Sequence, residues 1–173
     1  MIQRLLELDA RHSRRMCIAE RPGPIRNLAI ILAHSGDSWF WLTGLALVWW
    51  LGTDFWRTRA TVMAVGVLVT ASVVLAIKFS VRRQRPEGQW GNIYRSTDPH
   101  SFPSGHAARA IMLAVIGAGL GPAWLGLLLF IWAPLVPLAR VAMGVHYLSD
   151  ILAGALFGLA AGFVVLQVFP GFF

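Results

Sequence analysis

Long uncharged, apolar stretches alternate with short polar segments along this chain. The uncharged stretches cover residues 38–53, 60–77, 110–138 and 151–173. A helix needs about 20 mostly apolar residues to cross a bilayer, so the second and the fourth stretch can each supply one spanning helix. The third can supply two, because glycine and proline at positions 119–122 interrupt it. The first is short but can begin near Gly36. The pattern therefore predicts about five membrane-spanning helices.

The composition favours a membrane protein over a soluble domain. Hydrophobic residues make up 57% of the 173 residues, charged residues only 13%, and the mean hydropathy is +0.63. Cys17 is the only cysteine, which excludes a disulfide within the chain and makes a cysteine-based metal site improbable. We expect an all-α integral membrane helical bundle.

The N-terminal segment has a different pattern from the rest of the chain. Charged residues interrupt every apolar run within residues 1–16, which argues against a signal peptide and predicts an amphipathic helix lying in the membrane interface. Glycine and proline within residues 20–24 end this helix, and a second short helix leads to the first span. Residues 1–34 are therefore expected to form interfacial helices, and residues 35–173 the transmembrane domain. His12 and His34 fall in the first segment, where we expect no direct catalytic role.

The order of the spans places all polar clusters on one side of the membrane. If the first span begins on that side, the segments around Lys78, Ser104, Arg140 and Asp150 all return to it. The other side receives only the turns at 53–59 and 119–122 and the C-terminus. Polar groups gathered at one end of a helix bundle predict a functional site at the membrane surface.

The first candidate cluster follows the second span. Lys78 is the only lysine among 15 basic residues. If the helix continues as far as Pro86, Lys78, Arg82 and Arg85 lie nearly on one face. Arg82 and Arg83 have an alternative role, because arginines at helix ends commonly reach toward lipid phosphates.

The second cluster begins the third span. Ser104 suits a helix N-cap, and Gly105 allows a ligand to approach the backbone closely. Free amides and the positive end of the helix dipole favour phosphate at such a terminus.

The third cluster lies before the last span. His146 and Asp150 are four positions apart, so the carboxylate can accept a proton from one ring nitrogen and leave the other as a nucleophile or base. The pair could instead only satisfy itself at a helix end. A metal site built from His106, His146 and Asp150 is opposed by nearby Lys78, Arg85 and Arg140, which would repel a cation and attract an oxyanion.

Together these stretches resemble the type 2 phosphatidic acid phosphatase family, which shares its fold with the vanadium haloperoxidases. The matching residues are Lys78 with Arg85-Pro86, the run Pro103-Ser104-Gly105-His106, and Arg140 with His146 and Asp150. The resemblance covers about residues 34–170. Ala139 stands where the family usually has serine, and the first of the six spans found in many members is missing.

The resemblance implies a membrane lipid phosphate phosphatase that forms a phosphohistidine without a metal or other cofactor. His146 would be the nucleophile, Asp150 its orienting carboxylate and His106 the general acid and base. The phosphoryl oxygens would be bound by Lys78, Arg85, Ser104, Gly105 and Arg140. The substrate could be phosphatidic acid, phosphatidylglycerol phosphate, lipid A or a polyprenyl phosphate or diphosphate. A lipid phosphotransferase and a non-catalytic protein that binds anionic lipids remain alternatives.

The charge pattern bears on partners and location. The net charge is +7, but its arginines are scattered among helix ends, so the expected partners are the membrane and a lipid phosphate, with no nucleic acid. The oligomeric state is left open. We expect a multi-pass protein of a bacterial inner membrane. The excess of arginine in residues 1–34 favours a cytoplasmic active site, whereas many bacterial members of the family face outward.

Overall fold

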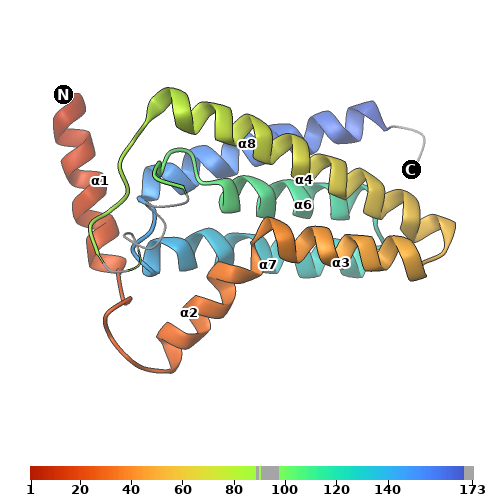
Figure 1. Ribbon diagram of the computed structural model, residues 1–173, viewed down its shortest axis with the longest axis horizontal. Coiled ribbons are helices and arrows are strands. Elements are labelled where there is room, and N and C mark those ends of the chain that lie inside the picture. Colours follow the sequence, from red (N-terminus) through yellow and green to blue (C-terminus); the bar gives the residue numbers. More distant parts are fainter. Residues whose placement is uncertain (89, 91–97, 170–173) are drawn as a thin grey trace.

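The computed structural model describes residues 1–88, 90 and 98–169, and these residues form helices joined by short connections. The helices are α1 (Ile2–Met16), α2 (Pro24–Ser35), α3 (Ser38–Leu51), α4 (Asp54–Val81), α6 (Gly105–Leu120), α7 (Ala123–Ala142) and α8 (Leu148–Val168). The long helices run side by side, and α1 lies across one end of the bundle (Figure 1). The expected all-α bundle is confirmed. Residues 89 and 91–97, part of the long polar connection at 86–103, lie outside the described residues.

The most buried helix is α6, which packs against α4, α7 and α8. Three glycines on α8, spaced four apart, let its backbone come close to α6. A Cβ at Gly158 would lie 2.1 Å from the Ala108 carbonyl oxygen, and one at Gly154 would lie 2.3 Å from that of Ser104. This close approach joins the start of α8, with Asp150, to the start of α6, with Ser104.

The apolar surface fits a membrane environment. Many large apolar side chains on the outer faces of the bundle are exposed, among them Leu68, Leu127, Leu152 and Leu156. By length and composition, α4, α7 and α8 could cross a bilayer, whereas α3 and α6 are apolar but shorter, with 14 and 16 residues. The apolar helices follow the predicted order, and α7 continues through Pro134 and Pro137.

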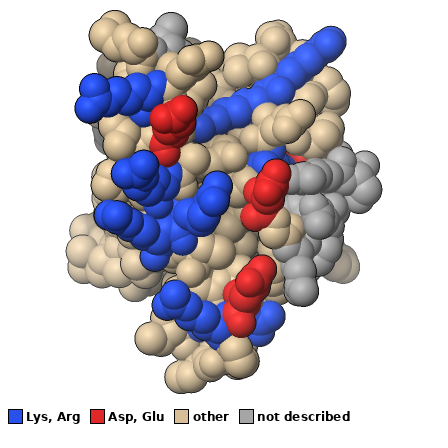
Figure 2. All heavy atoms as spheres, turned by 90° about the vertical axis from the view of Figure 1, so that its left-hand side faces the viewer, with Lys and Arg blue, Asp and Glu red and all other residues tan. Residues whose placement is uncertain are grey.

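The helix α1 is more than an interfacial segment, because it packs on α7 and α8. The Ser149 amide donates to the Asp9 carboxylate (3.1 Å), and the Leu148 amide donates to the Ser13 hydroxyl (2.9 Å). On its outer side α1 exposes Leu5 and Leu6 together with several arginines. Figure 2 shows Lys and Arg gathered over this end of the molecule.

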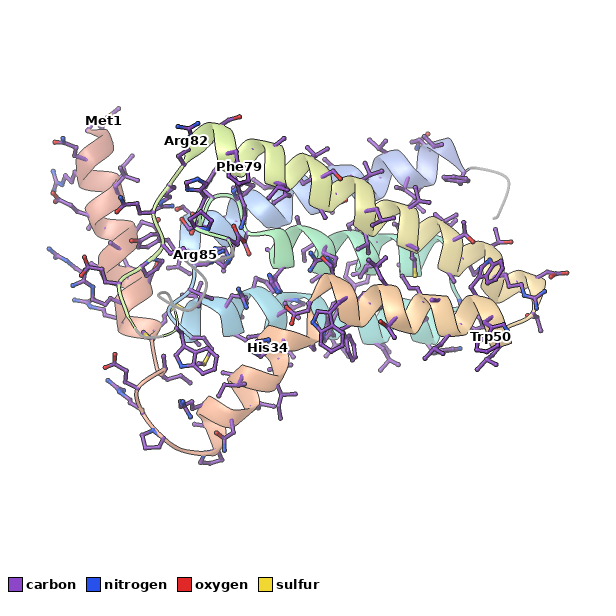
Figure 3. The ribbon with its side chains drawn as sticks, in the orientation of Figure 1. Met1, His34, Trp50, Phe79, Arg82 and Arg85 are labelled. Atoms are coloured by element: carbon purple, nitrogen blue, oxygen red, sulfur yellow. The ribbon has the colours of Figure 1, made fainter. Side chains whose placement is uncertain are left out.

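The expectation that α4 continues to Pro86 is wrong. The helix ends at Val81, and Arg82 takes the left-handed conformation (φ 54°) with its amide donating to the Lys78 carbonyl at 2.8 Å. The chain then runs beside residues 98–101, where the Ser101 amide donates to the Arg83 carbonyl (2.8 Å). Arg85 therefore reaches the interior through this turn and does not share a helix face with Lys78. In Figure 3 Arg85 points inward at the α1 end, far from Trp50 at the other.

Candidate active site

Buried cations form the centre of the site. Lys78 lies in the last turn of α4, Arg85 in the segment that follows, and Arg140 in the last turn of α7, and each side chain is buried. Arg140 is close enough to interact electrostatically with Lys78, His106 and His146. Burying several cations together is costly without an anion nearby, so the cluster is suited to hold a polyanionic group.

In the structure the anion is a carboxylate that the sequence did not single out. Asp98 forms an ion pair with Lys78 and accepts a hydrogen bond from Nη2 of Arg85 at 2.7 Å. The Nε of Arg85 also donates to the Asp98 carbonyl oxygen at 2.7 Å. The Asp98 carboxylate thus stands where the sequence predicts a phosphoryl group, between two of its expected ligands.

The start of α6 agrees with its predicted role as a helix N-terminus. Ser104 is the N-cap, and its hydroxyl accepts from the Ala107 amide at 3.4 Å. The Ser104 amide donates to the carbonyl oxygen of Asp150 at 3.0 Å, which fixes the start of α6 against α8. A Cβ built at Gly105 would lie 3.4 Å from a Val74 methyl, an ordinary van der Waals distance.

His146 lies between α7 and α8 with its ring buried. Its Nε2 is 3.4 Å from Nη1 of Arg85, and its Nδ1 is 3.5 Å from Oδ2 of Asp150, somewhat long for a hydrogen bond. Burial, followed by the charges of Arg85, Arg140 and Lys78, lowers the pKa of His146 well below its usual value. The ring is therefore neutral at physiological pH and keeps a lone pair.

Asp150 is buried, and its carboxylate accepts hydrogen bonds from the segment after α4 and from the start of α8. Its Oδ2 accepts from the Tyr147 amide at 2.8 Å in a capping box, and its Oδ1 accepts from Nη1 of Arg83 at 2.7 Å. Arg83 also donates to Ser149 Oγ (2.6 Å) and to the Asp9 carboxylate (2.8 Å), and it lies over the Tyr147 ring. The interpretation of Arg83 as a lipid-facing arginine is wrong, because it joins α1 to the carboxylate behind His146. Arg82 is exposed.

His106 has a carboxylate of its own, which the sequence reasoning also missed. Its Nε2 is 2.7 Å from Oδ1 of Asp37, the N-cap residue of α3. Burial alone would raise the pKa of Asp37, but its contacts with His106 and then with His34 outweigh burial and hold this pKa at about 2. Asp37 precedes the first apolar stretch, and nothing local in the sequence links it to His106.

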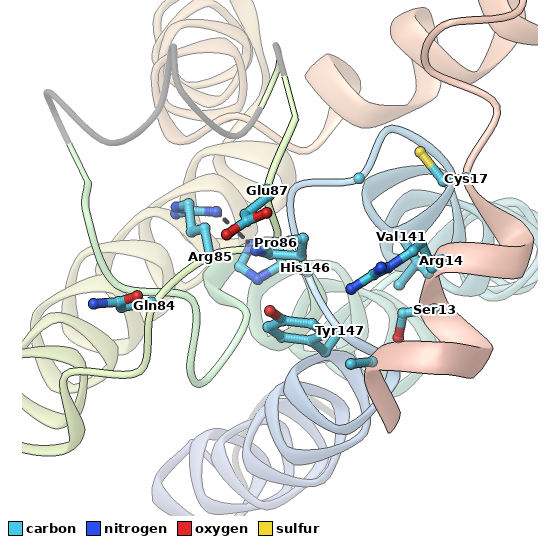
Figure 4. A pocket seen from close by; sticks show the side chains of 12 residues that line it. Ser13, Arg14, Cys17, Gln84, Arg85, Pro86, Glu87, Val141, His146 and Tyr147 are labelled. Carbon is cyan, nitrogen blue, oxygen red and sulfur yellow. Dashed lines mark hydrogen bonds between the residues drawn. The ribbon is translucent and has the colours of Figure 1, made fainter. Parts of the chain in front are cut away.

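Among the described residues, a cavity and a groove border this centre. On the His146 side, a cavity of about 390 Å³ is lined by Arg85, Tyr147 and residues of α1 that include Arg14, and Cys17 also lines it (Figure 4). On the His106 side, a groove of about 460 Å³ lies between α3 and α4. Its walls combine polar residues, including Lys78 and Asp98, with apolar ones, including Trp39 and Leu75.

Comparison with known proteins identifies the family. Residues 59–173 match the family model of the PAP2 superfamily. The chain belongs to the PAP2 superfamily. A decaprenylphosphoryl-5-phosphoribose phosphatase of Mycobacterium tuberculosis is 31% identical over 155 residues, covering 89% of this chain and 85% of that protein. An undecaprenyl-diphosphatase of Sulfolobus acidocaldarius is 31% identical over 154 residues, covering 83% and 70%.

Solved structures show the same fold. The crystal structure of a transmembrane PAP2-type phosphatidylglycerolphosphate phosphatase from Bacillus subtilis superposes with a TM-score of 0.76, at 21% identity, over 95% of this chain and 85% of that one. Aquifex aeolicus LpxE gives a TM-score of 0.70, at 22% identity, over 94% of both chains. The family resemblance and the membrane protein class predicted from the sequence are confirmed.

The PAP2 motifs bring all eight predicted site residues to the α1 end of the bundle. Lys78, Arg85 and Arg140 form the cationic centre, and the start of α6 and the His146–Asp150 pair lie beside it. His106 and His146 pair with different carboxylates, those of Asp37 and Asp150. Among the described residues, no three His, Cys, Asp or Glu side chains are grouped so as to hold a metal ion.

Proposed function

We propose that this PAP2 protein is a membrane lipid phosphate phosphatase that works through a phosphohistidine on His146. The observation that carries the proposal is the neutral, buried ring of His146, whose Nε2 lies 3.4 Å from a guanidinium nitrogen of Arg85 at the edge of the cationic centre. A site of this kind attracts a phosphoryl group and presents a nucleophile to it. The two relatives named above, a decaprenylphosphoryl-5-phosphoribose phosphatase and an undecaprenyl-diphosphatase, support the same class.

In the first step, Nε2 of His146 forms a bond to phosphorus as the bond from phosphorus to the leaving oxygen breaks. His106 gives a proton to that oxygen, and the charge on the His146 ring is balanced by Asp150. Lys78, Arg85 and Arg140, with Ser104 and the Gly105 amide, hold the other phosphoryl oxygens. Asp98 has to yield its place to the incoming phosphoryl group.

In the second step, His106 takes a proton from water as the water oxygen attacks phosphorus and the bond to Nε2 breaks. Inorganic phosphate leaves and both histidines return to their starting states. The same residue serves as acid and then as base, as microscopic reversibility requires.

The leaving group departs opposite His146, on the side of His106. The groove there is lined partly by Trp39, Ala71 and Leu75, which suit the apolar portion of a lipid. We infer a multi-pass protein of the bacterial cell membrane, in which residues 1–34 form helices at the interface and residues 35–173 the catalytic bundle.

The test is release of inorganic phosphate by the purified protein from a panel of phosphatidic acid, phosphatidylglycerol phosphate, lipid A and polyprenyl phosphates and diphosphates. His146→Ala should abolish release from every active substrate. His12→Ala, which changes an exposed histidine of α1, is the matched control and should retain wild-type activity. Activity above a few per cent in His146→Ala would refute the nucleophile assignment, and no release from any substrate would favour a non-catalytic lipid-binding protein.

A further inference from the structure

Asp37 lies between α2 and α3 and takes no part in the reaction steps given above. Its carboxylate joins two histidines. Oδ1 is 2.7 Å from Nε2 of His106, and Oδ2 is 3.2 Å from Nδ1 of His34. The side chains of His106 and Asp37 are only 17% and 18% exposed, whereas that of His34 is 45% exposed. The strong, shielded contact is therefore the one with His106.

The turn that carries Asp37 is fixed against the ring of His106. The Arg109 guanidinium donates to the Gly36 carbonyl, and the Asp37 amide donates to the His34 carbonyl at 2.9 Å. Gly36 packs directly on the ring, since a Cβ there would lie 3.1 Å from Cδ2 of His106 and 2.6 Å from a Val136 methyl. Asp37 is thus a carboxylate held at a set place beside His106.

We propose that Asp37 is the positioning residue of His106 and that His106 transfers its proton through Nδ1. This inference rests on the proposed function. A carboxylate that accepts a proton from one ring nitrogen fixes the tautomer and leaves the other nitrogen for chemistry. Asp150 approaches Nδ1 of His146, whereas Asp37 approaches Nε2 of His106. The two histidines therefore work through opposite nitrogens, Nε2 for the nucleophile and Nδ1 for the acid and base.

The proton can be followed through both steps. As the bond from phosphorus to the leaving oxygen breaks, the proton on Nδ1 of His106 passes to that oxygen, and Nε2–H remains donated to Asp37. When water attacks, Nδ1 takes the proton of the water. The negative charge of Asp37 stabilises the protonated ring, offsetting the nearby guanidinium groups of Arg109 on α6 and Arg140 on α7.

The experiment compares Asp37→Asn with the wild type on two kinds of substrate. An alkyl lipid phosphate needs its leaving oxygen protonated, whereas p-nitrophenyl phosphate has a leaving group that needs little help. For the alkyl substrate kcat/KM should fall roughly 10²-fold, the size of a general-acid contribution. For p-nitrophenyl phosphate kcat/KM should change by less than about threefold, while kcat and KM fall together because the phosphoenzyme forms but is hydrolysed slowly. Asp37→Glu should recover part of the alkyl activity.

The matched control is Asp54→Asn, which removes an almost fully exposed carboxylate at the other end of the bundle and should match the wild type on both substrates. An equal loss of kcat/KM on both substrates would reduce Asp37 to a structural role, and so would no loss on either. If even the wild type released no phosphate, the proposed function itself would fail.

A measurement on the wild-type protein does not depend on how the variant folds. The ring ¹⁵N shifts of His106 should show a proton on Nε2 throughout the pH range of activity. A ring protonated only on Nδ1 would overturn the inference.

Discussion

At the scale of single residues, the site is organised by carboxylates that contact the cations and the histidines. Asp98 contacts Lys78 and Arg85, Asp150 contacts His146 and Arg83, and Asp37 contacts His106. The three carboxylates have different roles. Asp98 balances buried positive charge before substrate arrives, whereas Asp37 and Asp150 fix and stabilise imidazole rings.

Because Asp98 occupies the expected phosphoryl position, it competes with anions for the same cations. Asp98→Asn should therefore tighten inhibition by vanadate, which mimics a transferring phosphoryl group, by roughly tenfold, or about 1.4 kcal/mol. The inhibition constant of vanadate measures this, with Asp54→Asn as the control. Weaker inhibition in Asp98→Asn would mean that Asp98 instead holds the cations in place for the phosphoryl group.

Because the His146 ring is neutral in the folded protein, the stability of the protein against unfolding should fall as the pH is lowered. The pKa of His146 is lower in the folded protein than the usual value of about 6.5 that applies after unfolding. The stabilisation is therefore present above about pH 6.5 and is lost as pH falls below it, by up to about 1.4 kcal/mol per pH unit. The melting temperature in detergent should fall between pH 7 and pH 5, and it should fall less in His146→Gln. The same slope in both proteins would contradict this account of His146.

The sequence predicted the motif residues of the site but not the distant side chains that hold them in place. Lys78, Ser104 and His146 belong to local patterns in which residue type and spacing point to phosphate chemistry. Asp37 is 69 positions from His106, and Asp9 is 74 positions from Arg83. Only the folded chain brings such pairs together, so no local pattern could reveal them.

At the scale of the helices, the apolar stretches predicted the order of the elements but not where α4 ends. Pro86 predicts the end of a helix that continues past Val81, but α4 does not reach it. Arg82, four residues after Lys78, takes the left-handed conformation and donates its amide to the Lys78 carbonyl, which ends the helix. An arginine carries no strong local preference for this conformation. The turn is accompanied by tertiary contacts, because Arg83 reaches Asp9 and Asp150.

The glycines of α8 provide a test at this scale. Gly158→Ala would place a Cβ about 2.1 Å from the backbone carbonyl of Ala108, so α8 has to move away from α6. We expect a loss of roughly 1–3 kcal/mol in stability and a fall in activity, because Asp150 moves relative to Ser104. Gly44→Ala, at a position with no atom within 4 Å of the new Cβ, is the control and should be neutral or slightly stabilising. Equal melting temperatures for the two variants would refute the role of this close contact.

At the scale of the whole molecule, the described polar site groups and α1 lie at one end of the bundle, and the other end carries the turn between α3 and α4. The sequence predicted that the polar groups gather at one end, because the order of the spans alone requires it. It did not predict that α1 forms part of the wall of the cavity beside His146, since amphipathicity does not tell a membrane surface from a protein surface.

Labelling of Cys17 can show which side of the membrane the site faces. This cysteine is partly exposed and lines the same cavity. By the positive-inside rule, the arginines of residues 1–34 predict that this end faces the cytoplasm. A membrane-impermeant maleimide should therefore label Cys17 only after cells are permeabilised. Cys17→Ser is the control for labelling of other proteins. Labelling of Cys17 in intact cells would place the site outside and set aside the charge argument.

The covalent intermediate is the most direct test of the whole account. The purified protein should be quenched in alkali during turnover of an active lipid phosphate, and phosphate should then be mapped along the chain by mass spectrometry. We expect an acid-labile, alkali-stable phosphoryl group on His146 and none in His146→Ala. With p-nitrophenyl phosphate as the substrate, Asp37→Asn should carry more of this phosphoryl group than the wild type. Rapid turnover with no phosphorylated residue, or with the phosphoryl group on any residue other than His146, would contradict the mechanism.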